Sequence, residues 1–460
     1  MISISLKKIS ILTKGILYHI NDHEADNLFC NSVITDSRKY SLNSLFIALK
    51  GMRYDGHDFV KNIRKKGVVA LLVNRPVIVS CPQVVVKDTY LAMGILAAWV
   101  RSKSTAKVIA ITGSSGKTSV KDMVANILSQ CGKTLFTPGN YNNFIGVALT
   151  LFQLTKKHQY LVIEIGANHI GEIQYITNIV KPDSVLVNNL FISHLEGFGS
   201  LENIAKAKGE IFKGLKKNGT AVINLSSHDW KNWQHYCNNK QTIYFFSIIK
   251  QENSNFYAKN ISINFINTKF ELHTPKGLML ICLPLPGKHN ISNALAASAL
   301  AISVGATFDD INIGLSSVKS IFGRLYPIFL KPGKIILDDT YNANIGSMIV
   351  AADVLSQMPE YRILVIGDMH ELGDKSNIYY EKVGIAICNM KINIVLSFGY
   401  KSILISQKNC FGEHFTSKEK LTQRLIFLIK KHDIVSVLIK GSRNTRMEEI
   451  VNSIKRHFLC

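Results

Sequence analysis

Apolar positions along the chain form two recurring patterns, short uninterrupted runs and helically spaced stretches, which follow one another in turn. The runs are typical of strands buried on both faces of a parallel sheet, and they stand at residues 68–73, 107–112, 161–165 and 184–187. One helically spaced stretch starts at Lys117 and ends at Gly132. This order of strands and helices predicts an α/β fold built on a parallel sheet.

Changes in the hydrophobic pattern along the chain divide it into three expected domains. Residues 1–86 mix short strands and turns with a helix expected at 58–66, which predicts a small mixed α/β domain. A linking helix near 89–101 opens a central domain over 87–322. In that domain a parallel sheet of the phosphate-loop type is joined by an antiparallel patch at 256–283.

Residues 323–460 predict a second doubly wound domain, of Rossmann-like type. Apolar strands are expected at 335–337, 362–366, 392–398 and 435–439. Helices are expected between and after them, at about 347–357, 377–389, 418–431 and 445–457. The segment has no GxGxxG fingerprint, so a dinucleotide cofactor is not expected.

Composition narrows the range of partners. The 460 residues are 47% hydrophobic and 19% charged, and the formal net charge of +22 favours anionic partners. Because the basic residues are scattered rather than clustered, we expect nucleotides or acidic metabolites and no nucleic acid. Lys7, Lys8 and Lys14 interrupt the first apolar positions, and no stretch approaches 18 uninterrupted apolar residues. Neither a signal peptide nor a membrane helix is therefore expected.

Cysteine usage bears on the compartment. The eight cysteines include no CxxC pair and no zinc-type spacing with histidine. Several stand in apolar runs, as Cys282 does, which predicts reduced and mostly buried thiols in the cytoplasm. Nothing in the sequence demands more than a single copy, so we expect a monomer.

A glycine-containing loop joins the strand at 107–112 to the helix that starts at Lys117. Glycines let backbone N–H groups approach phosphates, and the helix N-terminus favours anions. Ile111 stands where the GxxxxGK[ST] pattern has glycine, so the chain carries the shorter form T-G-x-x-G-K-T from Thr112. We expect ATP and Mg²⁺ at a loop made of Gly113, Ser114, Ser115, Gly116, Lys117, Thr118 and Ser119.

Three polar residues beyond the loop are candidates for metal or phosphoryl chemistry. Glu164 interrupts an apolar strand, where an ionised carboxylate is costly unless it binds a metal or forms a core salt bridge; we favour Mg²⁺. His194 follows another apolar strand, at the sheet edge where ligands bind, and we favour a metal or phosphoryl role over a surface histidine. Lys208 would ordinarily be a solvated helix lysine.

Blocks in order along nearly the whole chain resemble motifs of the Mur ligases, the ATP-dependent amide-forming enzymes of peptidoglycan precursor synthesis. The blocks of the first two domains are T-D-S-R at 35–38, T-G-S-S-G-K-T at 112–118, T-P-G-N at 137–140, E-I-G-A-N-H at 164–169, H-L-E-G-F-G at 194–199 and G-K-H-N-I-S-N-A at 287–294. Those of the third are G-R at 323–324, D-D-T-Y-N-A-N at 338–344, G-D-M-H-E-L-G at 367–373 and K-G-S-R at 440–443.

The resemblance implies roles for individual residues. It implies a UDP-sugar domain, an ATPase domain and a Rossmann-like domain. Uridine diphosphate would be held at Thr35, Ser37 and Arg38; the alternative interpretation of these residues is a polar turn without a ligand. Further substrate contacts are expected at Asn142 and Asn143. The dipeptide is expected between the central domain and Tyr341, Asn342 and Asn344, because their loop follows the carboxyl end of a strand. Magnesium ligands are implied at Thr118, Glu164 and His194, and ATP contacts at Asn290 for adenine, Arg324 for the γ-phosphate and Asp339 for ribose.

Two of these implied roles leave alternatives open. Asn290 could instead be only the N-cap of a helix. Lys208 aligns with a lysine that some relatives carbamylate to make a metal-binding anion, and whether this chain does so is open. Together with Lys117, His194 and Arg324, it completes the implied catalytic set.

The E-x-G-A-N-H, D-x-Y-N-A-N and G-D-M-x-E-L-G forms imply UDP-N-acetylmuramoyl-tripeptide and D-alanyl-D-alanine as substrates. The tripeptide carboxylate would take the γ-phosphoryl group, and the amine of the dipeptide would then attack the acyl phosphate. Closure of the C-terminal domain would exclude water. One rival is a sister ligase that adds an amino acid to a shorter UDP-muramoyl peptide or glutamate to a folate; the sister that adds diaminopimelate or lysine would show a D-N-P-R-type motif, which is not found. Two other rivals are a P-loop protein that acts on nucleic acid and an inactive relative, which would have lost Lys117, Glu164, His194 or Arg324.

Overall fold

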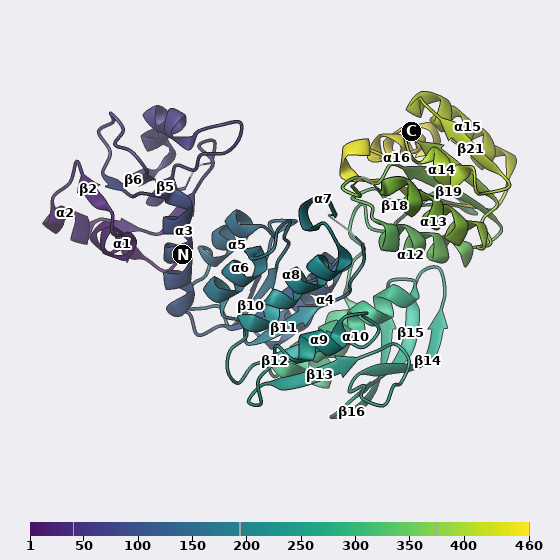
Figure 1. Ribbon diagram of the computed structural model, residues 1–460, viewed down its shortest axis with the longest axis horizontal. Coiled ribbons are helices and arrows are strands. Elements are labelled where there is room, and N and C mark those ends of the chain that lie inside the picture. The colour runs from purple at the N-terminus through teal and green to yellow at the C-terminus, as the bar shows by residue number, and fades with distance from the viewer. Residues whose placement is uncertain (40, 193–194, 374, 460) are drawn as a thin grey trace.

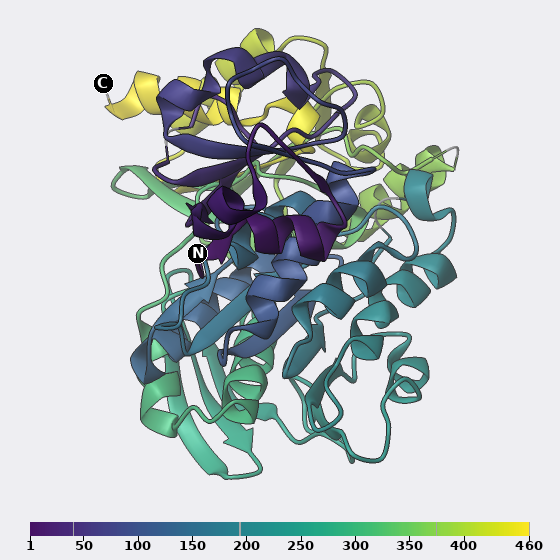
Figure 2. The ribbon, with the colours of Figure 1, turned by 90° about the vertical axis from the view of Figure 1, so that its left-hand side faces the viewer.

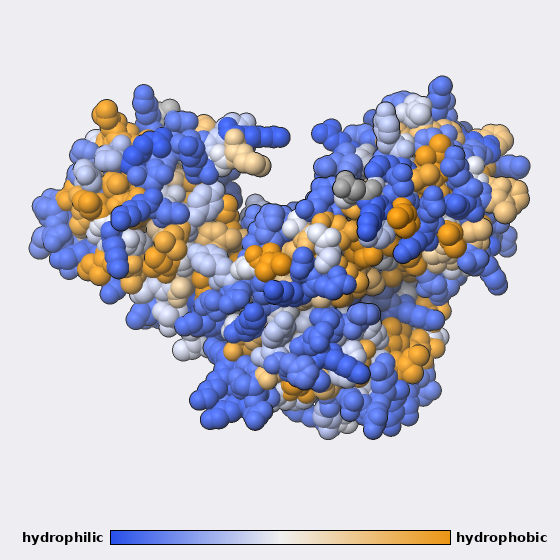
Figure 3. All heavy atoms as spheres, in the orientation of Figure 1, coloured by the Kyte–Doolittle hydropathy of each residue, from blue (hydrophilic) through white to orange (hydrophobic). Residues whose placement is uncertain are grey.

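The computed structural model describes residues 1–39, 41–192, 195–373 and 375–459. The chain forms three lobes, an N-terminal one, a central one and a C-terminal one (Figure 1). The N-terminal and C-terminal lobes rise from the same side of the central lobe, as a view along the long axis also shows (Figure 2). This arrangement leaves the surface deeply hollowed between the two outer lobes (Figure 3).

The N-terminal lobe is a mixed α/β unit, as the sequence predicts. Its five-stranded sheet has the order β2-β7-β6-β5-β4, parallel except for the β2–β7 pair. The strands are β2 Ile16–Tyr18, β7 Gln83–Val85, β6 Val68–Val73, β5 Ser44–Ile47 and β4 Ser32–Ile34. A small antiparallel pair, β1 Ile4–Ser5 and β3 Phe29–Cys30, lies beside helices α1 Leu6–Thr13 and α2 Asp22–Asn27.

The helix expected at 58–66 is present, and it is a 3₁₀ helix, η1 Gly56–Lys66. Its buried apolar residues, Val60 and Ile63, stand three positions apart. That spacing places them on one face of a helix with three residues per turn, so the 3₁₀ form buries both against the sheet.

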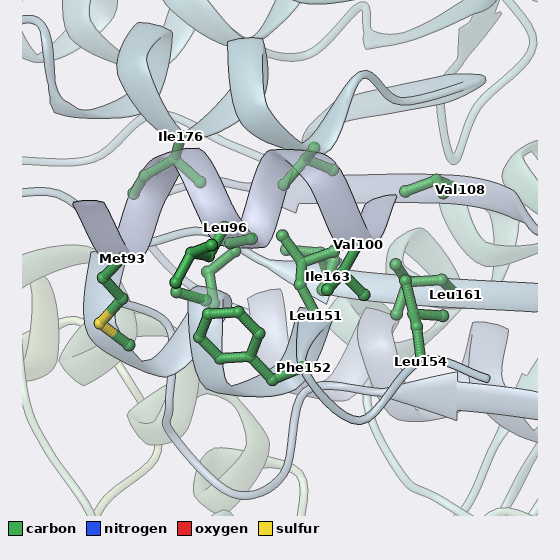
Figure 4. Packing of buried hydrophobic residues seen from close by; sticks show 14 of the residues in the cluster. Met93, Leu96, Val100, Val108, Leu151, Phe152, Leu154, Leu161, Ile163 and Ile176 are labelled. Carbon is green, nitrogen blue, oxygen red and sulfur yellow. The ribbon is translucent and has the colours of Figure 1, made fainter. Parts of the chain in front are cut away.

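Helix α3, Thr89–Ser102, joins the first two lobes and belongs to the core of both. The carboxylate of Asp88 caps it by accepting hydrogen bonds from the N–H groups of Tyr90 and Leu91, at 2.7 and 3.0 Å. Figure 4 shows side chains of α3 packed beside two other groups: those of the helical segment that leads to Phe152, and those of the strands of the central sheet. Each such buried aliphatic side chain contributes about 1.5–3 kcal/mol. The helix therefore fixes the N-terminal lobe firmly to the central one.

The central sheet is entirely parallel, with the order β13-β12-β11-β8-β10-β9. Its strands are β13 Thr242–Phe246, β12 Thr220–Asn224, β11 Ser184–Val187, β8 Lys107–Thr112, β10 Tyr160–Glu164 and β9 Thr134–Phe136. The helices next to the site are α4 Lys117–Cys131, α5 Phe144–Leu151, α6 Glu172–Val180, α8 Leu201–Lys213 and α10 Lys288–Ser303. Because β8 lies between β10 and β11, the loops that follow these three strands meet at one edge of the sheet.

The antiparallel patch is confirmed as the sheet β14-β15-β16, formed by Tyr257–Ile263, Thr268–Thr274 and Gly277–Leu283.

The expectation that most cysteines are buried is wrong. Cys282 points outward between inward-facing Ile281 and Leu283, so it is exposed despite its apolar neighbours. Of the seven cysteines among the described residues, only Cys30 and Cys81 are buried.

The C-terminal lobe has the predicted Rossmann-like fold. Its sheet has the order β17-β18-β22-β19-β20-β21 and is parallel except for β17–β18. The strands are β17 Tyr326–Lys331, β18 Lys334–Asp339, β22 Val435–Lys440, β19 Tyr361–Gly367, β20 Ile394–Phe398 and β21 Gly412–Phe415. The main helices are α12 Ile345–Ser356, α13 Ser376–Cys388, α15 Lys418–Lys431 and α16 Glu448–Leu459. Along the described ranges, no helix is both long and apolar enough to cross a membrane.

Candidate active site

A cavity of about 640 Å³ lies between the central and C-terminal lobes. The central lobe lines it with the loops that follow β8, β10 and β11 and with the start of α10. The C-terminal lobe lines it with the segments that follow β18, β19 and β22. Many of the lining residues thus lie at the carboxyl ends of parallel strands or at the start of a helix, where α/β proteins bind ligands, and the linking segment 318–325 adds a further wall.

The phosphate loop has the predicted strand–loop–helix geometry. Gly116 has φ +75° and precedes α4 without a side-chain cap, so the first N–H groups of that helix are open to an anion. The ammonium of Lys117 donates a hydrogen bond to the carbonyl of Gly113 at 2.8 Å, which curls it over the loop. Burial lowers the pKa of Lys117, the neighbouring Glu164 raises it, and the Arg324 cation lowers it further. A bound polyphosphate would supply the negative charge that this ammonium lacks.

The loop is held in place by the segment that follows β11. Ser114 Oγ donates to the carbonyl of Phe191 and accepts from its N–H, both at 2.9 Å. The amide of Asn189 accepts from Ser115 N–H at 2.8 Å and donates to the Ser115 carbonyl at 2.9 Å. The conformation of the loop is therefore fixed by the protein itself, which lowers the ordering cost of binding a ligand.

A chain of asparagine side chains connects this segment to α10. Asn188 Nδ2 donates to Asn293 Oδ1 at 3.1 Å, and Asn293 Nδ2 donates to Asn290 Oδ1 at 3.4 Å. Asn290 Nδ2 in turn donates to the carbonyl of Pro286 at 2.8 Å. The N-cap interpretation of Asn290 is wrong, because α10 begins at Lys288 and its N-cap residue is a glycine. Asn290 lies inside the helix and faces the cavity.

Glu164 lies at the end of β10 and is only 1% exposed. Its two carboxylate oxygens accept from Thr118 Oγ1 at 2.8 Å and from Asn142 Nδ2 at 2.7 Å. The salt-bridge interpretation is wrong for the described residues, among which Glu164 has no ion-pair partner. Its hydrogen bonds come from neutral donors and the Lys117 ammonium acts on it only through a coulombic interaction, so a carboxylate at this depth suits a directly bound cation.

The donor set fits Mg²⁺ in particular. A carboxylate and a hydroxyl meet beside a phosphate loop, and magnesium prefers one or two carboxylates completed by water and phosphate oxygens. Within the described part of the chain, no group of three or more His, Cys, Asp or Glu side chains forms an all-protein cage. His194, the other expected ligand, lies outside the described residues.

Lys208 lies on α8 and is 2% exposed, so it is not the solvated helix lysine that its position alone would suggest. Its side chain lines the cavity. Burial lowers its pKa well below the ordinary lysine range, and the nearby Lys117 cation lowers it further. Both causes favour the neutral, nucleophilic form of this amine more than in an exposed lysine.

The C-terminal lobe reaches the phosphate loop directly. Arg324 Nη2 donates to Thr118 Oγ1 at 3.0 Å, and its guanidinium lies 4.2 Å from the centroid of the Tyr341 ring. Asn344 caps α12 and donates from Nδ2 to Ser115 Oγ at 3.2 Å. Residues more than 200 positions apart in the sequence thus meet at the loop, as the expected closure requires.

Asp339, expected at the ribose, is engaged within its own lobe. Its Oδ2 pairs with Lys440 Nζ at 2.6 Å, and its Oδ1 accepts from Leu325 N–H at 3.1 Å. Lys440 also donates to the carbonyl of Asn342 at 2.9 Å. The buried ion pair fixes the loop that carries Tyr341 and Asn342 against the end of β22.

The residues expected at uridine diphosphate lie apart from this cavity. Thr35, Ser37 and Arg38 follow β4 in the N-terminal lobe and do not line the cavity. Arg38 is exposed and forms a two-pronged ion pair with Asp36, which lowers the pKa of that carboxyl to about 2. Asn143, expected at the substrate, does line the cavity, and it caps α5 by accepting from Gly146 N–H at 2.9 Å.

Several cavity residues escaped sequence reasoning. Asn188 and Asn189 could have been suspected from their place after an apolar strand, but not their partners. His289 stands in the G-K-H-N block, and burial lowers its pKa to about 4, so the ring is neutral at physiological pH. Its Nδ1 has no hydrogen-bond partner among the described residues, which leaves it available to a ligand.

These features define a class of protein. A phosphate loop, a buried carboxylate beside it and an arginine supplied by a second α/β lobe are the parts of an enzyme that uses a nucleoside triphosphate.

Comparison with known proteins gives the family. Three family models match: the Mur ligase family catalytic domain at residues 30–113, the Mur ligase middle domain at 111–301 and the Mur ligase glutamate ligase domain at 323–443. The chain belongs to the Mur ligase family and is an ATP-dependent ligase.

Its relatives match over their full length. UDP-N-acetylmuramoyl-tripeptide–D-alanyl-D-alanine ligase of Escherichia coli K12 is 49% identical over 460 residues, which are 100% of both chains. The crystal structure of MurF from Acinetobacter baumannii has a TM-score of 0.92 at 35% identity and covers 99% of each chain. MurF ligase from Thermotoga maritima, solved in complex with ADP, has a TM-score of 0.82 at 27% identity, over 93% of this chain and 98% of that one.

Proposed function

We propose that this ligase joins D-alanyl-D-alanine to UDP-N-acetylmuramoyl-tripeptide at the expense of ATP. The observation that carries the proposal is the contact of Arg324 and Asn344 with the phosphate loop, because it closes one cavity around the place where ATP and the two substrates would meet. The name of the Escherichia coli relative, which matches the whole chain at 49% identity, supports these substrates.

The reaction has two chemical steps. The terminal carboxylate of the tripeptide attacks the γ-phosphorus of ATP, the bond to the bridging oxygen breaks, and an acyl phosphate and ADP result. The amine of the dipeptide then attacks the acyl carbon, phosphate leaves with one former carboxylate oxygen, and the nitrogen loses a proton. Neither step needs a protein nucleophile, so the residues act by positioning and charge neutralisation.

Each lobe has its own part in this proposal. Residues 1–86, with Thr35, Ser37 and Arg38, bind the UDP moiety. Residues 87–322 bind ATP, with Gly113–Ser119 around the phosphates and Asn290 at adenine. Residues 323–460 supply Arg324 to the γ-phosphate, Asp339 to the ribose, and Tyr341, Asn342 and Asn344 to the dipeptide side. The proposal places the enzyme in the cytoplasm as a monomer, and a cavity built by one chain supports the monomer.

Thr118 and Glu164 would hold Mg²⁺, together with His194. When bound, the ion neutralises the charge of the β- and γ-phosphates. Asn142 keeps Glu164 oriented by donating to its second oxygen, so that one carboxylate oxygen remains directed at Thr118. Asn143 contributes through its cap, which fixes the start of α5 beside Asn142.

Removing the charge of Glu164 should raise the magnesium requirement. Glu164→Ala is expected to shift the Mg²⁺ dependence of ADP release to concentrations about tenfold higher or more, since the loop would lose its anionic oxygen ligand. The measurement is a Mg²⁺ titration at fixed ATP. The exposed Glu202, on α8, serves as control, and Glu202→Ala should titrate like the wild type. An unchanged curve for Glu164→Ala would assign Glu164 a structural role only.

Lys208 has the chemistry for carbamate formation. Its neutral amine can attack carbon dioxide, forming an N–C bond and releasing one proton, and the resulting carboxylate would relieve the repulsion from Lys117. With ¹³C-bicarbonate we expect a carbamate carbon resonance in the wild type that is absent in Lys208→Met. Lys206→Met, on the exposed side of the same helix, should retain it. A signal that persists in Lys208→Met would place the carbamate elsewhere.

The proposed reaction is tested by leaving out each substrate in turn. ADP release should require UDP-N-acetylmuramoyl-tripeptide and D-alanyl-D-alanine together, and the product mass should equal their sum less one water. Equal ADP release without either substrate, or turnover only with a single amino acid as acceptor, would contradict the proposal.

A further inference from the structure

Helix α12 lies on the side of the C-terminal lobe that faces the central lobe (Figure 1). Gly346, Val350 and Val354 follow one another at intervals of four residues, so they lie on one face of this helix. At one end of that face the ring of Phe191 fills the space beside Gly346, and at the other end Val354 lies close to Gly287. Val350, between them, lines the cavity. This face of α12 is therefore a contact surface between the two lobes.

The tightest contact on this surface joins Gly346 to the aromatic ring of Phe191. A Cβ atom on Gly346 would stand 2.6 and 2.8 Å from the Cδ1 and Cδ2 atoms of the ring, and closer still to its Cγ. Carbon atoms in ordinary contact are about 3.5–4.0 Å apart, so no side chain fits there while the ring and the helix keep their places. Gly346 has helical backbone, which any residue but proline adopts. It is therefore the ring of Phe191 that calls for a glycine at this position.

Phe191 is joined by its backbone to the phosphate loop. Its N–H donates to Ser114 Oγ, and its carbonyl accepts from the same hydroxyl, both at 2.9 Å. Asn344, two residues before Gly346, donates from Nδ2 to Ser115 Oγ at 3.2 Å. The ring of Phe191 and the amide of Asn344 thus hold the start of α12 against two adjacent residues of the loop.

The position of the C-terminal lobe decides whether Arg324 reaches the phosphate loop. Its guanidinium donates to Thr118 Oγ1 at 3.0 Å. The same guanidinium lies over the ring of Tyr341, and Tyr341 N–H donates to the carbonyl of Gly323, so Arg324 moves with its own lobe. Making room for a Cβ on Gly346 would move the lobes apart by about 1 Å, which takes this hydrogen bond beyond its normal range.

We propose that the ring of Phe191, packed on Gly346, sets the closed position of the C-terminal lobe and thereby places Arg324 and Asn344 on the phosphate loop. Phe191 is a positioning residue, because it acts through these two side chains. A ring against a helix backbone is a stiff contact, whereas a long side chain such as arginine can adjust its length of reach. The inference rests on the proposed function, since its kinetic test uses the ligation reaction.

The test fills the space beside the ring. Gly346→Ala should lower kcat by about tenfold or more, because a misplacement of about 1 Å can cost about 10² in rate. The midpoint of thermal unfolding should stay or rise, since alanine favours a helix more than glycine does. Gly384, in α13 of the same lobe, is the matched control, because its Cβ would meet only Lys408 and Ile405 of that lobe, at 3.0–3.2 Å. Gly384→Ala should keep the wild-type kcat.

Removal of the ring shows whether the contact itself is the cause. Phe191→Ala keeps both backbone hydrogen bonds to Ser114 but makes room for a Cβ at position 346. Phe191→Ala alone should lower kcat about threefold or more, because α12 loses the surface on which it rests. In the Phe191→Ala background, Gly346→Ala should then change kcat by less than about twofold, since the two residues are coupled.

Three results would overturn the proposal: a wild-type kcat in Gly346→Ala, a wild-type kcat in Phe191→Ala, or an equal cost of Gly346→Ala with and without the ring. The first would show that the ring turns aside without moving the lobe, and the third that alanine acts through something other than the ring. Wild-type ligation of D-alanyl-D-alanine is measured first, because its absence would refute the proposed function rather than this inference.

Discussion

Replacing Lys117 by alanine should abolish ligation while leaving the fold and the binding of UDP-tripeptide intact. Lys117 lies at the start of α4 and supplies the cation closest to the expected β- and γ-phosphates. Phosphoryl transfer proceeds through charge neutralisation, so the loss of this ammonium should lower kcat by roughly a factor of 10³ or more. Burial lowers the pKa of Lys117, so the charged group adds little to folding and the unfolding midpoint should not fall.

The readouts are ADP release under saturating substrates and calorimetric binding of UDP-tripeptide. Lys107, the exposed first residue of β8, is the matched control, because it stands on the strand that leads into the same loop. Lys107→Ala should retain wild-type activity. Undiminished ADP release by Lys117→Ala would refute the assignment of the phosphate loop.

The second large effect concerns stability. Lys440 is 2% exposed and pairs with Asp339 at 2.6 Å. Lys440→Met should lower the free energy of unfolding by about 3–5 kcal/mol, because it leaves a buried carboxylate without its cation. Urea unfolding followed by circular dichroism measures the loss.

A double variant separates the unpaired charge from lost packing. Asp339→Asn combined with Lys440→Met removes both charges, so it should recover much of the stability lost in Lys440→Met. The more exposed ion pair of Lys7 with Asp22 is the control, and Lys7→Met should cost less than about 1 kcal/mol. A small loss for Lys440→Met, similar to that control, would show that the pair does not hold the loop after β18.

The architecture was predictable where the hydrophobic pattern was strong. The run at 107–112 matches β8 residue for residue, and the expected helix from Lys117 matches α4. The helix expected at 58–66 is present, but its 3₁₀ type could not be predicted, because a 3₁₀ helix and a short α-helix place apolar residues at nearly the same spacing. The expectation that Cys282 is buried was wrong, because a run of apolar residues does not reveal which face of an antiparallel strand is covered.

The sequence pointed to several residues that the structure brings to the cavity, but not to the contacts between them. Motif blocks pointed to Glu164, Asn290 and Arg324, yet no spacing in the sequence predicts that Arg324 meets Thr118. The hydrogen-bonded asparagines at 188, 293 and 290 depend on how α10 packs beside β11, a tertiary fact. The packing of Phe191 on Gly346 was likewise invisible, because nothing in the sequence shows that these two residues are neighbours.

The central claim is that this phosphate loop serves an acyl-phosphate-forming ligase rather than a simple ATPase. The most direct measurement uses UDP-tripeptide labelled with ¹⁸O in both oxygens of its terminal carboxylate. If the carboxylate attacks the γ-phosphorus, each phosphate released on ligation to D-alanyl-D-alanine carries one labelled oxygen, and the mass spectrum of phosphate shows it. Unlabelled phosphate released together with the amide product would contradict the account.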